Sequence, residues 1–171
     1  FFVYFAFHEP YSVVASPKEL VDKYPDMPKK DAEYLANIDH LDMAIGKILD
    51  YLSVNNLIEN TIIIFSSDNG SYRVASNGGL RAGKSSLYEG GIHVPGIIRW
   101  SGVTTEKKVI DTPGGFVDIV PTFCEILGIN TPSGLDGTSI LPLLKGNNFE
   151  RKRPLYWFFY RTVPEIAIRV G

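Results

Sequence analysis

The most constraining feature of the sequence is an apolar run that ends in polar residues, Thr61-Ile-Ile-Ile-Phe-Ser-Ser-Asp68-Asn69-Gly70. Its β-branched and aromatic side chains predict a strand that is buried on both faces. In open α/β sheets, ligands bind just beyond the carboxyl ends of such strands. Asp68 and Asn69 stand at that position and offer oxygen ligands to Ca²⁺ or Mg²⁺. The alternative for these residues is a simple Asn-Gly turn that reverses the chain.

The composition is that of one domain with a hydrophobic core. The chain has 171 residues, of which 44% are hydrophobic, and its formal net charge is -2. This charge gives no indication of nucleic-acid binding, and no apolar run reaches the roughly 20 residues that span a bilayer. The one cysteine, Cys124, lies on the apolar face of an expected helix, so we interpret it as a core thiol. No secretory signal peptide is visible in the chain.

The first third of the chain has a strand, helix, strand order. Residues 1–7 are apolar and predict a strand, and residues 61–66 predict another. Between them, residues 31–53 carry apolar side chains at three- and four-residue spacings, which predicts a helix with Asp31 as its N-cap or first-turn acid. This order favours a parallel pair of strands. Because strand patterns stand at both ends of the chain, we expect a piece of a longer polypeptide.

Residues 71–93 form a glycine-rich stretch without periodicity, and a loop of this length is usually functional or disordered. Its mixture of glycines with charged residues and tyrosine favours an ordered, functional loop. Beyond it, Asp118 is expected to cap a helix, with Pro121 in its first turn and Gly128 at its end. The full set of later elements is a strand over 94–100, a helix over 118–128, a turn at Asp136-Gly137, a short helix over 139–145, and strands over 156–160 and 166–170.

Two basic residues are candidates for binding an anion. His8 follows its strand as Asp68 follows its own, so in one parallel sheet the two share a rim, where a histidine can bind an anion or donate a proton. Lys84 lies between Gly83 and Ser85, whose small side chains allow close approach of phosphate or sulfate oxygens. A backbone-bonded loop histidine and a solvated surface lysine are the alternatives.

Other polar residues receive no catalytic role. The letters of a P-loop occur over residues 78–85, but no strand precedes them and no clear helix follows, so we reject a nucleotide site. His40 is expected to be solvated or to cap a helix, and His93 stands at the entry of a strand without an assigned role. Asp39 and Asp42 flank the apolar stripe of the long helix and are interpreted as structural.

Taken in order, these segments resemble the sulfatase family of the alkaline-phosphatase-like superfamily, and in particular its arylsulfatase and N-acetylgalactosamine-6-sulfatase branch. The resemblance covers nearly the whole chain. The residues that carry it are His8-Glu9-Pro10, Asp42-Met43-Ala44-Ile45-Gly46-Lys47-Ile48-Leu49, Phe65-Ser66-Ser67-Asp68-Asn69-Gly70, Leu80-Arg81-Ala82-Gly83-Lys84, Tyr88-Glu89-Gly90-Gly91-Ile92-His93-Val94-Pro95, Asp118-Ile119-Val120-Pro121-Thr122, Leu135-Asp136-Gly137 and Ala167-Ile168-Arg169-Val170-Gly171.

The resemblance implies a fold and a domain division. The expected fold is α/β, with part of a mixed, mostly parallel sheet flanked by helices, which is incomplete in this chain. Residues 1–150 would be the C-terminal part of the catalytic domain, and residues 151–171 the start of a small C-terminal subdomain.

The resemblance also implies site residues. Asp68 and Asn69 match ligands of one Ca²⁺, Lys84 matches a lysine that contacts the sulfate group, and His8 matches the histidine near the bridging ester oxygen. His93 stands where the family more often has arginine. The family nucleophile, a formylglycine made in a Cys/Ser-x-Pro-x-Arg motif, is absent from this chain, as are the paired aspartates that complete the metal site. The chain alone is therefore expected to be inactive.

The family reaction is hydrolysis of a sulfate ester, in which a hydrated aldehyde attacks sulfur and basic side chains stabilise the sulfuryl oxygens. A sulfated carbohydrate or an aryl sulfate is the expected substrate, and a periplasmic, extracellular or lysosomal location is expected. A phosphate or phosphonate ester hydrolase of the same superfamily is one alternative, and a non-catalytic protein that binds sulfated glycans is another. Self-association through an exposed sheet edge is also expected.

Overall fold

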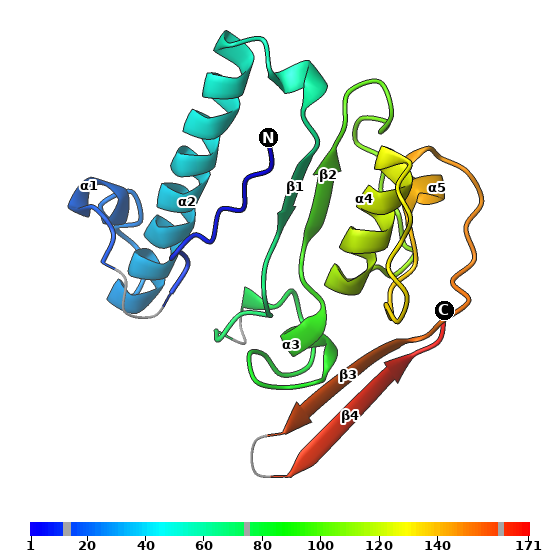
Figure 1. Ribbon diagram of the computed structural model, residues 1–171. Coiled ribbons are helices and arrows are strands. Elements are labelled where there is room, and N and C mark those ends of the chain that lie inside the picture. Colours follow the sequence, from blue (N-terminus) through cyan, green and yellow to red (C-terminus); the bar gives the residue numbers. More distant parts are fainter. Residues whose placement is uncertain (12–14, 74–75, 161–162) are drawn as a thin grey trace. The chain divides into compact units, whose positions relative to one another are not determined.

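The computed structural model describes residues 1–11, 15–73, 76–160 and 163–171 (Figure 1). The chain divides into two compact units, residues 1–60 and residues 61–171. Both of the strand pairs that the described residues form lie in the second unit.

The first unit is built around one long helix. Helix α2 (Lys29–Val54) begins after Pro28, and the short helix α1 (Lys18–Val21) packs on it. The helix predicted over 31–53 is thereby confirmed. Asp31 lies in the first turn of α2, and Pro28 is the N-cap. A negative charge in the first turn interacts favourably with the free N–H groups of the helix start. A short 3₁₀ helix, η1 (Ile58–Asn60), follows the end of α2.

The buried face of α2 differs from the apolar stripe that its spacing indicates. Its buried residues are Ala32, Ala36, Asn37 and Leu52, whereas Ile38 in the stripe is exposed. Two small residues one turn apart leave room for the neighbouring segment to approach. The Asn37 amide fits this close packing because it donates to Ser16 Oγ at 2.6 Å and to the Glu33 carbonyl at 2.9 Å.

Residues 1–7 do not form the predicted strand. They have no regular secondary structure, and Phe1 is 86% exposed. The expected parallel pairing of this segment with residues 61–66 stays a prediction, because the two segments belong to different units and the neighbour that the structure gives to the second strand is the antiparallel β2. The sequence pattern is strongly β-prone, but a strand forms only where a neighbouring strand completes its hydrogen bonds.

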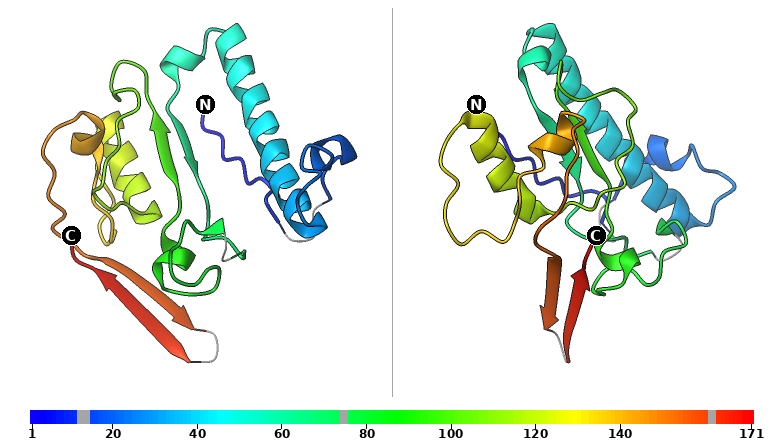
Figure 2. Two further views of the ribbon diagram at one scale, coloured as in Figure 1. Left: turned by 180° about the vertical axis from the view of Figure 1, so that it is seen from behind. Right: turned by 90° about the vertical axis from the view of Figure 1, so that its right-hand side faces the viewer.

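The second unit contains the strand that precedes Asp68. Strand β1 (Ile63–Ser66) pairs antiparallel with β2 (Gly96–Arg99), and Ser66 lies opposite Gly96. Both strands are at their predicted places. Burial on both faces is wrong for β1, since Ile64 is exposed and its neighbours are half-buried. Helix α4 (Ile119–Leu127) lies beside this ribbon (Figures 1 and 2). Side chains of the ribbon, of the residue before it and of the helix line a small apolar cavity, among them Ile62, Ile64, Ile98, Ile119, Phe123 and Ile126.

Helix α4 (Ile119–Leu127) follows a 3₁₀ turn, η3 (Phe116–Asp118), and confirms the predicted helix. Gly128 ends it with a φ of +65°, a left-handed conformation that glycine adopts without strain. Cys124 is buried and makes no disulfide, as expected of a core thiol. Asp118 stands at the N-cap position, but its side chain does not cap α4 and instead accepts hydrogen bonds from the N–H groups of Gly115 and Thr138.

The turn after α4 is displaced from its predicted place. It lies at Ser133-Gly134, and Asp136-Gly137 has no assigned turn. Gly137 has a packing role instead, because a Cβ at this position would lie 1.8 Å from the Val117 carbonyl oxygen. Helix α5 (Leu141–Leu144) falls within the predicted range of 139–145.

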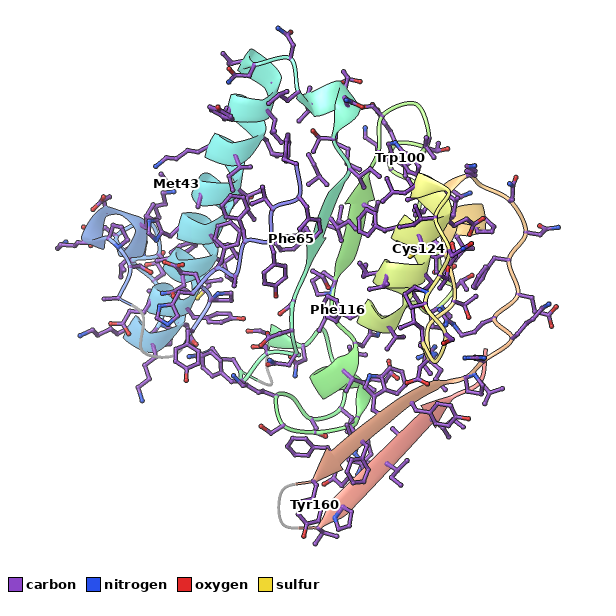
Figure 3. All side chains as sticks on the ribbon, viewed as in Figure 1. Met43, Phe65, Trp100, Phe116, Cys124 and Tyr160 are labelled. Carbon is purple, nitrogen blue, oxygen red and sulfur yellow. The ribbon has the colours of Figure 1, made fainter. Side chains whose placement is uncertain are left out.

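The chain ends in an antiparallel pair, β3 (Leu155–Tyr160) and β4 (Pro164–Arg169), which confirms the two strands predicted there. Figure 2 shows this pair extending away from the β1–β2 ribbon, and Figure 3 places Tyr160 at its far end. Tyr156, Phe158 and Tyr160 alternate along β3 and are all exposed.

Candidate active-site loops

Asp68 and Asn69 follow the end of β1 in an irregular bend. The Ser67 hydroxyl donates to the Asn69 carbonyl oxygen at 3.0 Å, which turns the backbone back on itself. The Asp68 side chain is exposed, and Asn69 is half-buried. The alternative of a two-residue Asn-Gly hairpin is wrong, because the strand that pairs with β1 begins only at Gly96.

The bend after β1 packs closely against a second segment, Gly90-Gly91, through contacts between glycine backbones. The Gly70 N–H donates to the Gly91 carbonyl oxygen at 2.8 Å. A Cβ on Gly70 would lie 1.8 Å from the Gly90 carbonyl oxygen, far inside van der Waals contact. Gly70 is therefore required by close backbone approach, and the end of β1 is held directly on the start of α3 (Glu89–Ile92).

Lys84 is held beside the same bend through its backbone. Its N–H donates to the Ser71 carbonyl oxygen at 3.0 Å, three residues after Asp68. Gly91 packs directly against the segment around Lys84. A Cβ at Gly91 would lie 2.6 Å from the Gly83 carbonyl oxygen and 2.1 Å from that of Ser86, so only glycine allows this contact. The Lys84 side chain lies on the exposed side of the loop. Asp68, Asn69 and Lys84 therefore stand on backbone segments that are bonded to one another.

Three further side-chain contacts involve residues of the glycine-rich loop. The Arg81 guanidinium lies 3.6 Å from the centre of the Tyr88 ring, a cation–π contact. The Glu89 carboxylate pairs with His93 Nδ1 at 3.1 Å and with Arg169 Nη1 at 3.2 Å. These contacts join described residues of the loop to one another and to β4, and they give His93 a partner that its position in the sequence did not indicate.

His8 belongs to the first unit, whereas Asp68, Asn69 and Lys84 belong to the second. The His8 side chain is exposed, and its ring stacks on that of Tyr11 with centroids 6.0 Å apart. Because the two residues belong to different units, the prediction that His8 and Asp68 lie at the same edge of one sheet stays a prediction.

Two of the other polar residues considered in the first unit, His40 and Asp39, have side-chain partners. His40 Nδ1 pairs with Glu9 Oε1 at 3.0 Å, and Asp39 Oδ2 pairs with Lys23 Nζ at 3.0 Å. The structural role expected of Asp39 agrees with that ion pair. His40 is not merely solvated, and no local pattern signalled its contact with a residue 31 positions away.

The donors after β1 suit a hard cation in part. A carboxylate and a carboxamide are the oxygen ligands that Ca²⁺ and Mg²⁺ prefer, and Asp68 presents its carboxylate on the surface. Within residues 1–11, 15–73, 76–160 and 163–171, no group of three or more His, Cys, Asp or Glu side chains is arranged to hold a metal. Asp68 and Asn69 thus offer two oxygen donors, fewer than the roughly six to eight that Ca²⁺ takes, so a cation here would need further ligands.

Comparison with known proteins identifies the family. The sequence model of the Sulfatase family matches residues 1–129. A sulfatase of Formosa agariphila is 34% identical over 98% of this chain and 35% of its own length. Human N-acetylgalactosamine-6-sulfatase is 30% identical over the whole of this chain and 33% of its own length. This chain therefore spans about a third of the length of these relatives.

The solved structures agree with the sequence relatives. The crystal structure of Ps i-CgsB in complex with k-i-k-neocarrahexaose matches with a TM-score of 0.86 and 30% identity, covering 95% of this chain and 38% of that one. The fold is the α/β fold of the alkaline-phosphatase-like superfamily, present in part. The chain belongs to the sulfatase family, whose members are hydrolases of sulfate esters. Such enzymes work with a metal ion and a formylglycine.

Proposed function

We propose that the whole protein hydrolyses sulfate esters of carbohydrates and that this chain supplies part of its catalytic domain. Residues 1–150 would belong to that domain and residues 151–171 to the start of a C-terminal subdomain. The observation that carries the proposal is the backbone contact between the Asp68-Asn69 bend and the Lys84 segment. It brings the backbone segments of two candidate oxygen ligands and one candidate sulfate-binding lysine next to each other, as a sulfate site would need.

Asp68 and Asn69 would hold one Ca²⁺ together with ligands from residues outside this chain. The bound cation would offset the negative charge of the sulfate oxygens. Both side chains are oxygen donors, and the glycine contacts of Gly70 fix their backbone before any ligand arrives. Such preorganisation matters because donors that are already aimed need not reorganise during the reaction.

Lys84 would bind a sulfate oxygen through its ammonium group, since its backbone is fixed and its side chain reaches the exposed side of the loop. His8 would give its proton to the ester oxygen as the alcohol leaves. The formylglycine nucleophile would come from residues outside this chain. This division of roles predicts that the chain alone does not turn over substrate.

The carbohydrate substrate is supported by the names of the relatives. One acts on N-acetylgalactosamine 6-sulfate by its name, and the solved structure holds a neocarrahexaose. We propose a location outside the cytoplasm, where sulfated polysaccharides are found. Among the described residues, none of the helices is both long and apolar enough to cross a membrane.

The polypeptide encoded by the complete gene should be expressed with a formylglycine-generating enzyme and assayed on 4-nitrophenyl sulfate, on sulfated oligosaccharides and on 4-nitrophenyl phosphate. We expect the sulfate esters to be preferred. Lys84→Ala should lower kcat/KM about 10²–10³-fold, the usual effect of removing one preorganised donor. Lys145→Ala, a change of another exposed lysine in the second unit, should leave it unchanged.

Two results would overturn the proposal. Faster hydrolysis of the phosphate ester would move the protein to phosphate or phosphonate chemistry. Absence of turnover, together with retained binding of a sulfated glycan that Lys84→Ala weakens, would make it a binding protein.

A further inference from the structure

The loop that carries His8 is tied to helix α2 by a charged side chain. Glu9, the next residue, places its Oε1 atom 3.0 Å from His40 Nδ1. The Glu9 side chain is only 18% exposed, and that of His40 is 43% exposed. A partly shielded hydrogen bond to a charged group is stronger than a fully exposed one. The contact therefore restrains the backbone on the C-terminal side of His8.

The chemistry of the two groups fixes the direction of this hydrogen bond. An ionised carboxylate only accepts, so the hydrogen must be carried by Nδ1 of His40. His40 lies near the middle of the 26-residue helix α2, far from either helix end. The backbone hydrogen bonds of the helix make it a stiff support for the imidazole. Glu9 is thus held by a rigid element rather than by another loop.

The ring of His8 has a second restraint. Its plane lies within 13° of the plane of the Tyr11 ring, with the centroids 6.0 Å apart. Glu9 and Pro10 separate the two aromatic residues in the sequence. The Glu9–His40 hydrogen bond to α2 is therefore made between the two stacked residues, His8 and Tyr11. Loss of this hydrogen bond would free the backbone segment that carries both rings.

We propose that His40 and Glu9 are positioning residues that set the orientation of the His8 imidazole. The role of His8 itself rests on the proposed function, whereas its restraint rests on contacts within the first unit. Neither residue touches substrate in this proposal. His40 acts on Glu9, and Glu9 acts on the backbone that presents His8.

The first experiment is steady-state kinetics of the complete gene product on 4-nitrophenyl sulfate. Glu9→Ala and His40→Ala should each lower kcat about 10-fold or more with little change in KM, because small displacements of a reacting group are costly. Glu9→Gln keeps an acceptor for the Nδ1 hydrogen, and His40→Asn keeps a donor near the Nδ1 position, so both should restore most of the rate. Lys47→Ala, on an exposed position of the same helix, is the matched control.

A merely structural role would give a different pattern. It would lower the melting temperature without a selective fall in kcat, and the conservative variants would not rescue. The double variant Glu9→Ala/His40→Ala should be no worse than either single variant if the two residues act as one unit. Additive losses would overturn the proposal.

The second experiment reads His8 directly and does not depend on turnover. The same polypeptide is labelled with ¹⁵N-histidine, and the signals of His8, His40 and His93 are assigned from His8→Gln, His40→Asn and His93→Gln. Glu9→Ala should reduce the Nδ1–H form of His40 and shift the ring signals of His8, while those of His93 stay in place. Unchanged His8 signals would overturn the proposal. A shift of His8 in a protein that hydrolyses no sulfate ester would uphold the restraint and refute the proposed function instead.

Discussion

Arg151 and Asp118 form an ion pair in the interior of the second unit. Arg151 Nη1 donates to Asp118 Oδ1 at 3.0 Å and Nη2 donates to Oδ2, and the two side chains are 5% and 0% exposed. The same carboxylate accepts from the N–H groups of Gly115 and Thr138, while Nη2 also donates to the Pro113 carbonyl oxygen. One pair therefore joins the segments before and after α4 to the segment that leads into β3.

We expect Arg151→Ala to lower the free energy of unfolding by about 3–5 kcal/mol, because it leaves the Asp118 carboxylate buried without its counter-ion. Urea unfolding followed by circular dichroism measures this. The control is Arg153→Ala, which removes an exposed guanidinium bonded to the Leu135 carbonyl oxygen and should cost about 1 kcal/mol or less. Equal losses in the two variants would show that the buried pair has no special role.

The sequence located Asp118 but not its function. A helix-start pattern correctly placed it before α4, since capping residues, proline and the terminal glycine are local signals. Its partner Arg151 lies 33 positions away, beyond the reach of any local pattern. The buried pair could be found only once the chain was folded.

Gly91 should not tolerate a side chain. A Cβ there would lie 2.1 Å from the Ser86 carbonyl oxygen, so Gly91→Ala must displace backbone rather than a flexible side chain. We expect a loss of about 1–3 kcal/mol in the free energy of unfolding and weaker sulfate binding, measured by urea unfolding and by calorimetry. Gly46→Ala is the control: nothing lies within 4 Å of its Cβ position, and alanine in a helix should add about 0.5–1 kcal/mol. A stable, fully binding Gly91→Ala would mean that the loop has another arrangement in solution.

Metal binding should depend on Asp68. Treating the complete gene product with EDTA should lower its melting temperature, and Ca²⁺ should restore it. A free cation concentration of 100 times Kd stabilises by about 2.7 kcal/mol. Asp68→Ala should lose this response, whereas Asp111→Ala, another exposed carboxylate of the second unit, should keep it. A full Ca²⁺ response in Asp68→Ala would remove Asp68 from the ligand shell.

The site was predictable in its parts and not in its arrangement. The polar end of an apolar run marked Asp68 and Asn69, and the glycines of residues 71–93 marked the irregular segment that carries Lys84. The close backbone contact of Gly70 with Gly90 and Gly91 could not be predicted, because it joins segments about 20 residues apart in the sequence. Residues 1–7 failed as a strand for the opposite reason: their pattern is local, but a ladder needs a partner.

Tyr24 gives the first unit a pH dependence in the alkaline range. Desolvation and a side-chain hydrogen bond to Asp39 raise the pKa of Tyr24 above its ordinary value of 10.0. A raised pKa means that the folded chain favours the neutral phenol. Its contribution to stability is therefore complete below pH 10 and is lost as the pH rises through the folded-state value. Asp39→Asn should return the pKa of Tyr24 toward 10.0 in an ultraviolet absorbance titration read as a difference from Tyr24→Phe, and an unshifted titration in Asp39→Asn would exclude the carboxylate as a cause.

The chain studied alone should self-associate, because its last two strands present an apolar face. Phe158 lies opposite Ile166 and is 67% exposed, and Tyr156 lies opposite Ile168. In the part of the chain that the structure describes, β3 and β4 pair only with each other, so their outer edges are open to strands of another molecule. Light scattering should give a mass that rises with concentration, and Phe158→Thr/Ile166→Thr should reduce that rise because threonine keeps β propensity while removing apolar area. A monodisperse monomer across the concentration range would contradict this, since it would require both the face and the edges to be covered in solution.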